Sequence, residues 1–355
     1  MVRVTGNFQS ESPIHPKALA LLESAFEAGW ADPKKLGQAS AKAALLRNEA
    51  IESIASHLKI HPSQIETFGD PALGHHLSLT ALMQERSQLV HSAIDRSEIF
   101  AIAQSARTTV LPVNHDGNIL GTHSPSPHSV LALQIANGET GVIQKCDEII
   151  EDVQPELIAL DATVSGFQVE LPRRWNTALF SSASWEGPAG VGILAIADRS
   201  VWRNPLPHIS AARTGLSAYL PLLLASALAL EERVSMAREE ELRRRQLTTA
   251  IRSELSKIAD CDIAGNLATS LPHITSASFM YCNGEEIIRS LAMDGFSVDS
   301  GSACTSENLE PSHVLAAMQV LTHGNVRITV HSGTTHDEVM GLLRSLSSTV
   351  IRMRA

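Results

Sequence analysis

One cysteine stands in a stretch whose neighbouring residues suit a reactive, exposed thiol. Cys304 lies in Ser300-Gly-Ser-Ala-Cys-Thr-Ser306, among small and hydroxyl-bearing side chains, and Glu310-Pro-Ser-His-Val314 follows shortly after it. Such small residues let the backbone turn sharply, and reactive side chains are commonly carried on loops. The stretch therefore predicts a loop that presents the Cys304 thiol and leads into a helix over residues 313–321.

The elements that position this loop are predicted from the spacing of apolar residues. Apolar runs bounded by turn residues predict strands, and apolar residues that recur every three or four positions predict helices. In the first two thirds of the chain the predicted strands cover residues 87–94, 108–113, 129–135, 157–162 and 191–196, and the predicted helices cover 15–29, 36–57 and 96–105. Strands separated by helices favour a mostly parallel sheet with helices on both faces.

A long helical stretch over residues 217–257 joins this region to a smaller one. Within it, glutamates at 239–241 each precede an arginine at 243–245 by four residues, a stabilising order that we interpret as a solvated helix face. The pattern that follows is strand 276–281, helix 284–294, helix 313–321, strand 325–330 and helix 335–351. We expect a large α/β domain over residues 14–236 and a small C-terminal α/β domain over 237–355, with an N-terminal arm over 1–13.

Composition excludes several classes of partner. The chain has 355 residues and a net charge of −10, which argues against nucleic acid or an anionic membrane as a partner. Its longest apolar run, about thirteen residues from 218 to 230 with a proline inside, is too short to span a bilayer. Because no N-terminal signal pattern is visible, we expect a soluble, cytoplasmic protein.

Neither the cysteines nor the histidines predict a metal site. The four cysteines stand far apart without paired spacing, which also argues against a disulfide framework. Four histidines lack the spacing of metal ligands, and we interpret them as surface residues: His75, His76, His123 and His128.

Several stretches, in order along the chain, resemble the cysteine desulfurases, which are class V aminotransferases with the fold-type I pyridoxal-phosphate (PLP) architecture. Besides the cysteine stretch they are Asn137-Gly-Glu-Thr-Gly-Val-Ile-Gln144, Asp161-Ala-Thr-Val-Ser165, Gly187-Pro-Ala-Gly-Val-Gly192, Leu271-Pro-His-Ile274, Val326-Arg-Ile-Thr329 and Thr334-Thr-His-Asp-Glu338. The resemblance implies an α/β protein of PLP-transferase fold-type I. It also implies a mostly parallel, seven-stranded sheet in the large domain and a homodimer.

The same resemblance assigns roles to individual residues. Cys304 corresponds to the sulfur acceptor, Arg327 to the anchor for the carboxylate of the amino-acid substrate, and Asn137 to a second substrate-binding residue. Asp161 corresponds to the partner of the pyridinium nitrogen of PLP, and Ser181 to a contact of its phosphate.

The catalytic lysine of the family has no counterpart in this sequence. Ala183 and Ser184 stand where the family has a histidine and the lysine that forms the Schiff base with PLP, and serine cannot form an imine. The chain has seven lysines, and none lies between Lys145 and Lys257. A lysine shifted by a few positions therefore does not replace the missing one.

Other contacts to the cofactor are also replaced. Asp70-Pro71-Ala72 stands in place of a Gly-Ala-Thr phosphate cradle, which adds a carboxylate that repels phosphate and removes an N–H donor. Arg96 stands where a histidine stacks on the pyridine ring, and three further family positions are changed, at Gly138, Val164 and Leu216. If each lost contact is worth about 1–2 kcal/mol, the affinity for PLP falls by many orders of magnitude.

Several of these residues also allow a purely structural interpretation. Without PLP, Asp161 would cap a helix or pair with an arginine, and Arg96 would fill the vacated volume. Arg327 would form an internal salt bridge with Asp161 or Glu139. Trp185, beside the missing lysine, is large enough to plug part of the cavity.

Three hypotheses on function follow. The first is a pseudo-enzyme without PLP or any other cofactor, which acts as a sulfur-transfer partner, a scaffold or a protein that binds an amino-acid-like ligand. The second is an active PLP-dependent cysteine desulfurase, which converts L-cysteine to L-alanine and passes persulfide from Cys304 to a sulfur-acceptor protein for iron–sulfur cluster or thio-cofactor assembly. The third is the inactive subunit of a heterodimer with an active paralogue.

Overall fold

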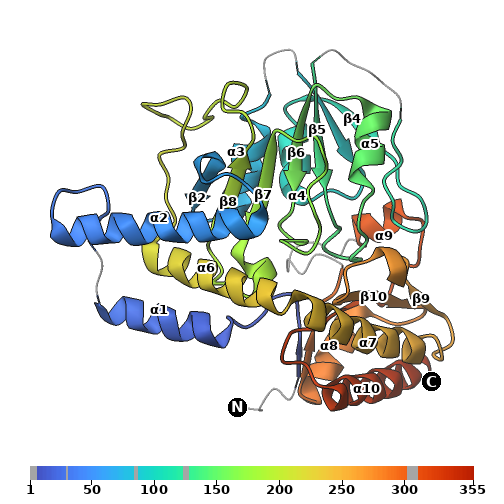
Figure 1. The fold of residues 1–355 in the computed structure, drawn as a ribbon. Coiled ribbons are helices and arrows are strands. Elements are labelled where there is room, and N and C mark those ends of the chain that lie inside the picture. The colour runs from blue at the N-terminus through green and yellow to red at the C-terminus, as the bar shows by residue number, and fades with distance from the viewer. Residues whose placement is uncertain (1–5, 29–30, 84–86, 123–127, 302–310) are drawn as a thin grey trace.

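The computed structural model describes residues 6–28, 31–83, 87–122, 128–301 and 311–355. They form a large α/β unit and a smaller α/β unit, which Figure 1 shows side by side. Among these residues, no helix combines the length and the apolar character needed to cross a membrane.

A seven-stranded sheet forms the centre of the large unit, with the strand order β2-β8-β7-β6-β5-β3-β4. Neighbouring strands from β7 to β4 run parallel, whereas β8 is antiparallel to both of its neighbours. The strands are β2 (Ile65–Phe68), β3 (Gln88–Ser92), β4 (Arg107–Leu111), β5 (Ser129–Gln134), β6 (Leu157–Asp161), β7 (Thr177–Ser181) and β8 (Gly192–Ile196). The predicted, mostly parallel sheet is confirmed, and β2 and β7 are strands that the apolar pattern did not reveal.

Helices cover both faces of this sheet. Because successive strand residues point to opposite faces, Leu89 joins the buried cluster on one face and Val90 the cluster on the other. One face is covered by α2 (Gln38–Leu58), α5 (Cys146–Val153) and α6 (Leu220–Ser235), with α1 (Pro16–Ala28) packed against α6, and the other face by α3 (Pro71–Leu79) and α4 (Ser97–Ala103). With both faces covered, β5 and β8 are buried along their whole length.

The smaller unit has an apolar cluster of its own around a three-stranded antiparallel sheet, β12-β10-β9. Its elements are α7 (Ala237–Leu255), β9 (Cys261–Ile263), β10 (Ile274–Phe279), α8 (Gly284–Met293), β11 (Phe296–Val298), α9 (His313–Ala317), β12 (Val326–Thr329) and α10 (His336–Arg354). The N-terminal strand β1 (Gly6–Phe8) pairs in parallel with β11. The helical stretch predicted over 217–257 is two helices, α6 and α7, which meet at Met236.

The charge run on α7 is only partly solvated. Glu239 and Glu241 are exposed, whereas Glu240 and Arg244 are each only 7% exposed. The interpretation of the run as a solvated face is wrong for these two residues, because the large unit covers this side of α7. Arg244 reaches across the junction to Glu186 of the large unit.

Candidate functional site

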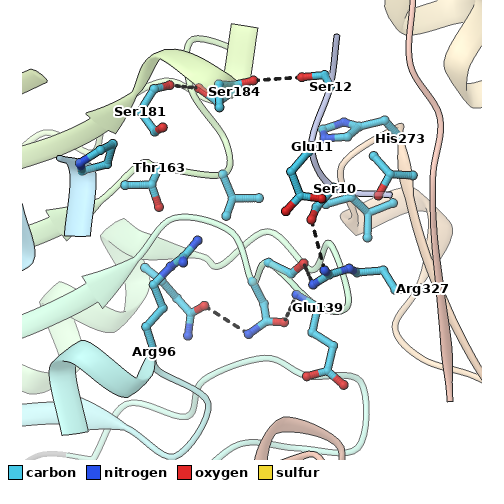
Figure 2. A pocket seen from close by; sticks show the side chains of 18 of the residues that line it. Ser10, Glu11, Ser12, Arg96, Glu139, Thr163, Ser181, Ser184, His273 and Arg327 are labelled. Carbon is cyan, nitrogen blue, oxygen red and sulfur yellow. Dashed lines mark hydrogen bonds between the residues drawn. The ribbon is translucent and has the colours of Figure 1, made fainter. Parts of the chain in front are cut away.

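A cavity of about 560 Å³ lies between the two units, at the carboxyl edge of the parallel strands. The loops that follow parallel strands meet at this edge, which is where open α/β sheets bind ligands. One wall comes from residues that follow β3, β5, β6 and β7 and from the start of α3, and the opposite wall from β12 and its surroundings. Residues 10–12 of the N-terminal arm line one side (Figure 2).

Asp161 ends β6 and is paired with an arginine. Arg96 Nε lies 3.2 Å from Asp161 Oδ2, and Thr163 donates hydrogen bonds to Asp161 Oδ1 from its backbone N at 2.8 Å and from Oγ1 at 2.6 Å. Burial opposes the ionisation of Asp161, but His75, Arg96 and Thr163 together leave its pKa below the ordinary value. Asp161 is thus an ionised carboxylate with an arginine partner, one of its two structural interpretations. Figure 2 shows Arg96 extending into the cavity.

The start of α3 lies at the same cavity and carries its own carboxylate cap. The Asp70 side chain accepts the N–H of Ala72 at 2.9 Å, and Pro71, the first residue of the helix, has no N–H to offer. One turn further on, His75 lines the cavity and is only 4% exposed. The interpretation of His75 as a surface residue is therefore wrong, because α3 packs against β7 and β8 and encloses this side chain.

The segment after β7 forms a short 3₁₀ helix, η2 (Ser182–Trp185). Ser184 lines the cavity, and its Oγ donates a hydrogen bond to the backbone O of Ser181 at 2.7 Å. All seven lysines of the chain lie within the described residues, and none of them lines this cavity. The cavity therefore contains serines, but no amine, along this segment.

Trp185 does not plug the cavity. Its side chain is 1% exposed within the apolar cluster beneath the sheet, and its Nε1 donates a hydrogen bond to the backbone O of Ser226 in α6 at 3.2 Å. The predicted plug is wrong because the turn of η2 directs this ring into the core.

Arg327 projects from β12 into the cavity, where its guanidinium is already engaged. Its Nη2 lies 2.9 Å from Asp299 Oδ2, and its Nη1 donates to the backbone O of Gly138 at 3.1 Å. The salt bridges predicted with two other carboxylates are wrong. Asp299 is the partner because its backbone pairs with that of Arg327 in an isolated antiparallel bridge, which brings the two side chains together.

Two buried carboxyl groups near the cavity titrate close to neutral pH. Burial raises the pKa of Asp95 to about 7, although its carboxylate accepts the N–H of Ser92 at 2.7 Å. Burial likewise raises the pKa of Glu139 to about 7, against the opposing effect of the hydrogen bond that Ser312 Oγ donates to Glu139 Oε2 at 2.8 Å.

A cluster of charged residues lies where α6 meets α7, and we refer to it as the hinge cluster: Glu186, Arg233, Glu240, Arg243 and Arg244. Arg244 Nη2 lies 3.0 Å from Glu186 Oε1, and Arg243 contacts both carboxylate oxygens of Glu240 at 3.0 Å. Arg233 and Arg244 line the cavity. The four-residue spacing of Glu240 and Arg244 predicted that these two side chains pair. Glu186 and Arg233 come from other segments, and nothing in the sequence indicated that they join the cluster.

Comparisons with known proteins agree on one family. Residues 220–342 match the family described as aminotransferase class-V. The cysteine desulfurase of Nostoc sp. is 27% identical over 334 residues, which cover 86% of this chain and 82% of that protein. The cysteine desulfurase IscS 1 of Archaeoglobus fulgidus is 32% identical over 236 residues, which cover 64% of this chain and 62% of that one.

Solved structures show the same fold over almost the whole chain. A NifS-like protein superposes with a TM-score of 0.82 at 21% identity and covers 97% of this chain and 98% of its own. The apo cysteine desulfurase of Thermococcus onnurineus superposes with a TM-score of 0.81 at 15% identity, covering 98% and 95%. The chain is thus similar to cysteine desulfurases over most of its length. The predicted PLP-transferase fold-type I is confirmed.

The sulfur acceptor of the cysteine desulfurase family corresponds to Cys304, which lies outside the described residues. On either side of that gap, the Gly301 N–H donates to Asn325 Oδ1 at 2.7 Å, and Ser312 is bonded to Glu139. The role of Cys304 stays a prediction.

Asn137 lines the cavity, but its side chain is occupied by neighbouring backbone. Its Oδ1 accepts the N–H groups of Glu139 at 2.9 Å and Thr140 at 3.0 Å, and its Nδ2 donates to the backbone O of Ile94 at 3.2 Å. Asn137 therefore holds the turn after β5. The substrate contacts of Asn137 and Arg327, and the contact of Ser181 with the PLP phosphate, stay predictions.

Proposed function

We propose that this cysteine-desulfurase-like protein does not use PLP and is a pseudo-enzyme. One observation carries the proposal: no lysine lines the cavity, in a chain whose lysines all lie among the described residues. PLP enzymes hold the cofactor as an imine of a lysine side chain, and a serine hydroxyl cannot form that bond. Ser184, at the corresponding position, instead donates its hydrogen to a backbone oxygen.

Two further contacts support the proposal. The residues present fit neither the phosphate group of PLP nor its protonated ring nitrogen. A phosphate group would be expected at the start of α3, where backbone N–H groups favour anions, but the Asp70 carboxylate already accepts one of them and would repel it. A protonated ring nitrogen would be expected at Asp161, but Arg96 already forms an ion pair with that carboxylate.

In place of desulfuration, we propose a role in sulfur transfer with Cys304 as an acceptor. The Cys304 thiolate would attack the outer sulfur of a persulfide on a donor protein, such as an active cysteine desulfurase. The S–S bond of the donor breaks, its thiolate leaves, and a new S–S bond forms on Cys304. One sulfur atom moves between two thiols, so the step needs neither an oxidant nor a cofactor.

The absence of PLP chemistry is tested by incubating the purified protein with excess PLP and reducing it with borohydride. We expect no visible absorption band after desalting, no PLP adduct in the mass spectrum and no sulfide from L-cysteine. A lysine-bearing relative, treated in parallel, is the positive control. A reduced adduct together with sulfide release would establish the alternative, an active cysteine desulfurase.

The acceptor role is tested separately with an active cysteine desulfurase that has been loaded with L-cysteine. We expect the mass of one sulfur atom to be added to this chain, and the addition to be lost in Cys304→Ser. Cys261→Ser is the matched control, since Cys261 is the only partly exposed cysteine among the described residues. An unmodified chain beside a fully loaded donor would refute the acceptor role without affecting the conclusion on PLP.

The predicted homodimer, or heterodimer with an active paralogue, stays a prediction. It is supported by large apolar side chains exposed on α1, on α2 and just before α6, which are Leu19, Phe26, Leu45 and Tyr219. Exposed apolar patches of this kind often mark interfaces between chains. Light scattering on the chain alone, and on its mixture with a PLP-binding paralogue, distinguishes the two assemblies from a monomer.

A further inference from the structure

Arg233, in the hinge cluster, is a buried guanidinium without a hydrogen-bond acceptor. Its side chain is 5% exposed, and its contacts with carboxylates are long: 4.0 Å from Nε to Glu186 Oε2 and 3.8 Å from Nη2 to Glu240 Oε2. It donates no hydrogen bond to any residue that the structure describes. A guanidinium has five N–H donors, and those of Arg233 are accessible from the cavity that this side chain lines, so an acceptor from outside the chain can reach them.

The hinge cluster also contains more cations than anions. Three arginines share the two carboxylates, and the carboxylates are occupied by Arg243 and Arg244 at 3.0 Å. Arg233 is therefore the cation in excess. Removing water from a charge that has no close partner is costly, and an anion beside Arg233 would offset that cost.

Further polar groups that form no hydrogen bond line the same cavity. Among the described residues, Nδ1 of His273 is buried without a hydrogen bond, and Nε of Arg244 is buried 3.4 Å from Glu240 Oε2 without forming one; both residues line the cavity with Arg233. Burial, followed by the charges of Arg244, His331 and Arg233, holds the pKa of His273 well below its ordinary value, which indicates a positive field.

We propose that a small anion with two or more acceptor oxygens, a carboxylate or a tetrahedral oxyanion, binds at the hinge between Arg233, Arg244 and His273. The anion would accept hydrogen bonds from donors that the chain leaves unused and would neutralise the excess charge of the hinge cluster. Because these groups come from α6, from α7 and from the residue before β10, the bound anion would connect the two units. The proposal goes beyond the proposed function and does not depend on the absence of PLP.

Anion binding is measured by calorimetric titration with sodium sulfate, sodium phosphate and sodium acetate at constant ionic strength. We expect one saturable site per chain, and the relative affinities identify the anion as tetrahedral or as a carboxylate. In Arg233→Met the affinity should fall by about 10- to 100-fold, as for the loss of hydrogen bonds to a charged group. Arg238→Met, which removes an exposed arginine from the same helix as Arg244, should bind like the wild type.

A thermal scan separates a binding role of Arg233 from a structural one. Arg233→Met leaves two arginines facing two carboxylates, so its midpoint without anion should equal or exceed that of the wild type. Added anion should raise the midpoint of the wild type alone. Arg233→Lys keeps the charge but loses the planar fork, and it should recover part of the affinity. A wild type that binds none of the three anions, or an Arg233→Met variant that binds them equally well, would overturn the proposal.

Discussion

Glu139→Gln is expected to stabilise the protein at alkaline pH and to do so progressively less at acid pH. The Glu139 carboxyl group lies between the two units, where Oε2 accepts the Ser312 hydroxyl at 2.8 Å and Oε1 has no partner among the described residues. Glutamine keeps the same shape and can keep the acceptor for Ser312. It differs from the carboxyl group mainly in having no charge to bury.

The magnitude follows from the pKa of Glu139, which burial raises from 4.5 to about 7. Because the folded state holds this proton more tightly than the unfolded state, the stability that Glu139 contributes is present below about pH 4.5 and is lost as the pH rises through about 7. At 1.36 kcal/mol per pKa unit, the loss is about 3 kcal/mol at pH 8 and under about 1 kcal/mol at pH 5. The free energy of unfolding of Glu139→Gln, relative to wild type, should therefore rise by about 2 kcal/mol over that interval.

Urea unfolding of both proteins at several pH values between about 5 and 8 measures this difference, with the slope of the free energy against urea checked for constancy. Glu148→Gln, which removes an exposed carboxylate, controls for the change in net charge. A difference between Glu139→Gln and wild type that does not vary with pH would refute the reasoning. A difference that grows toward acid pH would show that the carboxylate, not the acid, is the favoured buried form.

Three further perturbations test the cavity and the sheet beneath it. Ser184→Lys supplies an amine but should still give no PLP adduct after borohydride reduction. Asp70 continues to cap α3, and Arg96 continues to pair with Asp161, so both ends of the cofactor would lack their contacts. A stable adduct would show that these two contacts do not prevent PLP from binding. Arg96→Ala should lower the free energy of unfolding at neutral pH by about 1 kcal/mol, a modest loss because the Arg96 side chain is 40% exposed. The loss should be smaller near pH 3, where Asp161 is protonated in the unfolded state. Equal losses at both pH values would exclude the ion pair as the cause. Gly74→Ala should lower the free energy of unfolding by about 1–3 kcal/mol, because the added Cβ would overlap a buried leucine methyl of β7. This loss should exceed the gain from alanine being the better helix former. Unfolding of the variant at a higher urea concentration than wild type would show that the core rearranges to accept the methyl group.

Most helices and strands could be predicted from the sequence, because apolar runs and helical spacing depend only on residues that are close together in the chain. The strands β5, β6 and β8 were found since each is buried on both faces. The strand β2 was missed because Ile65–Phe68 is short and contains Glu66 and Thr67. The antiparallel direction of β8 could not be predicted either, because an apolar run does not distinguish a parallel from an antiparallel strand.

The pairing of charges was less predictable, because partners come from segments far apart in the chain. An arginine partner for Asp161 was among the structural interpretations, but the sequence did not identify Arg96 as that arginine. The partner of Arg327 was not among them, because Asp299 reaches it through a bridge outside the regular strands. Burial of the charge run on α7 depends on what the large unit places over that helix, which the spacing of glutamate and arginine does not encode.

Two arginines that line one cavity, Arg327 and Arg233, differ in how far their donors are already used within the chain. The resemblance predicts that Arg327 anchors the substrate, but its guanidinium is bound by Asp299 and by the backbone O of Gly138. A substrate carboxylate would have to displace an existing ion pair at 2.9 Å, which reduces the gain from binding there. Arg233 lines the same cavity and has donors that no residue of the described chain accepts. An anionic ligand would therefore meet less competition from existing ion pairs at Arg233 than at Arg327.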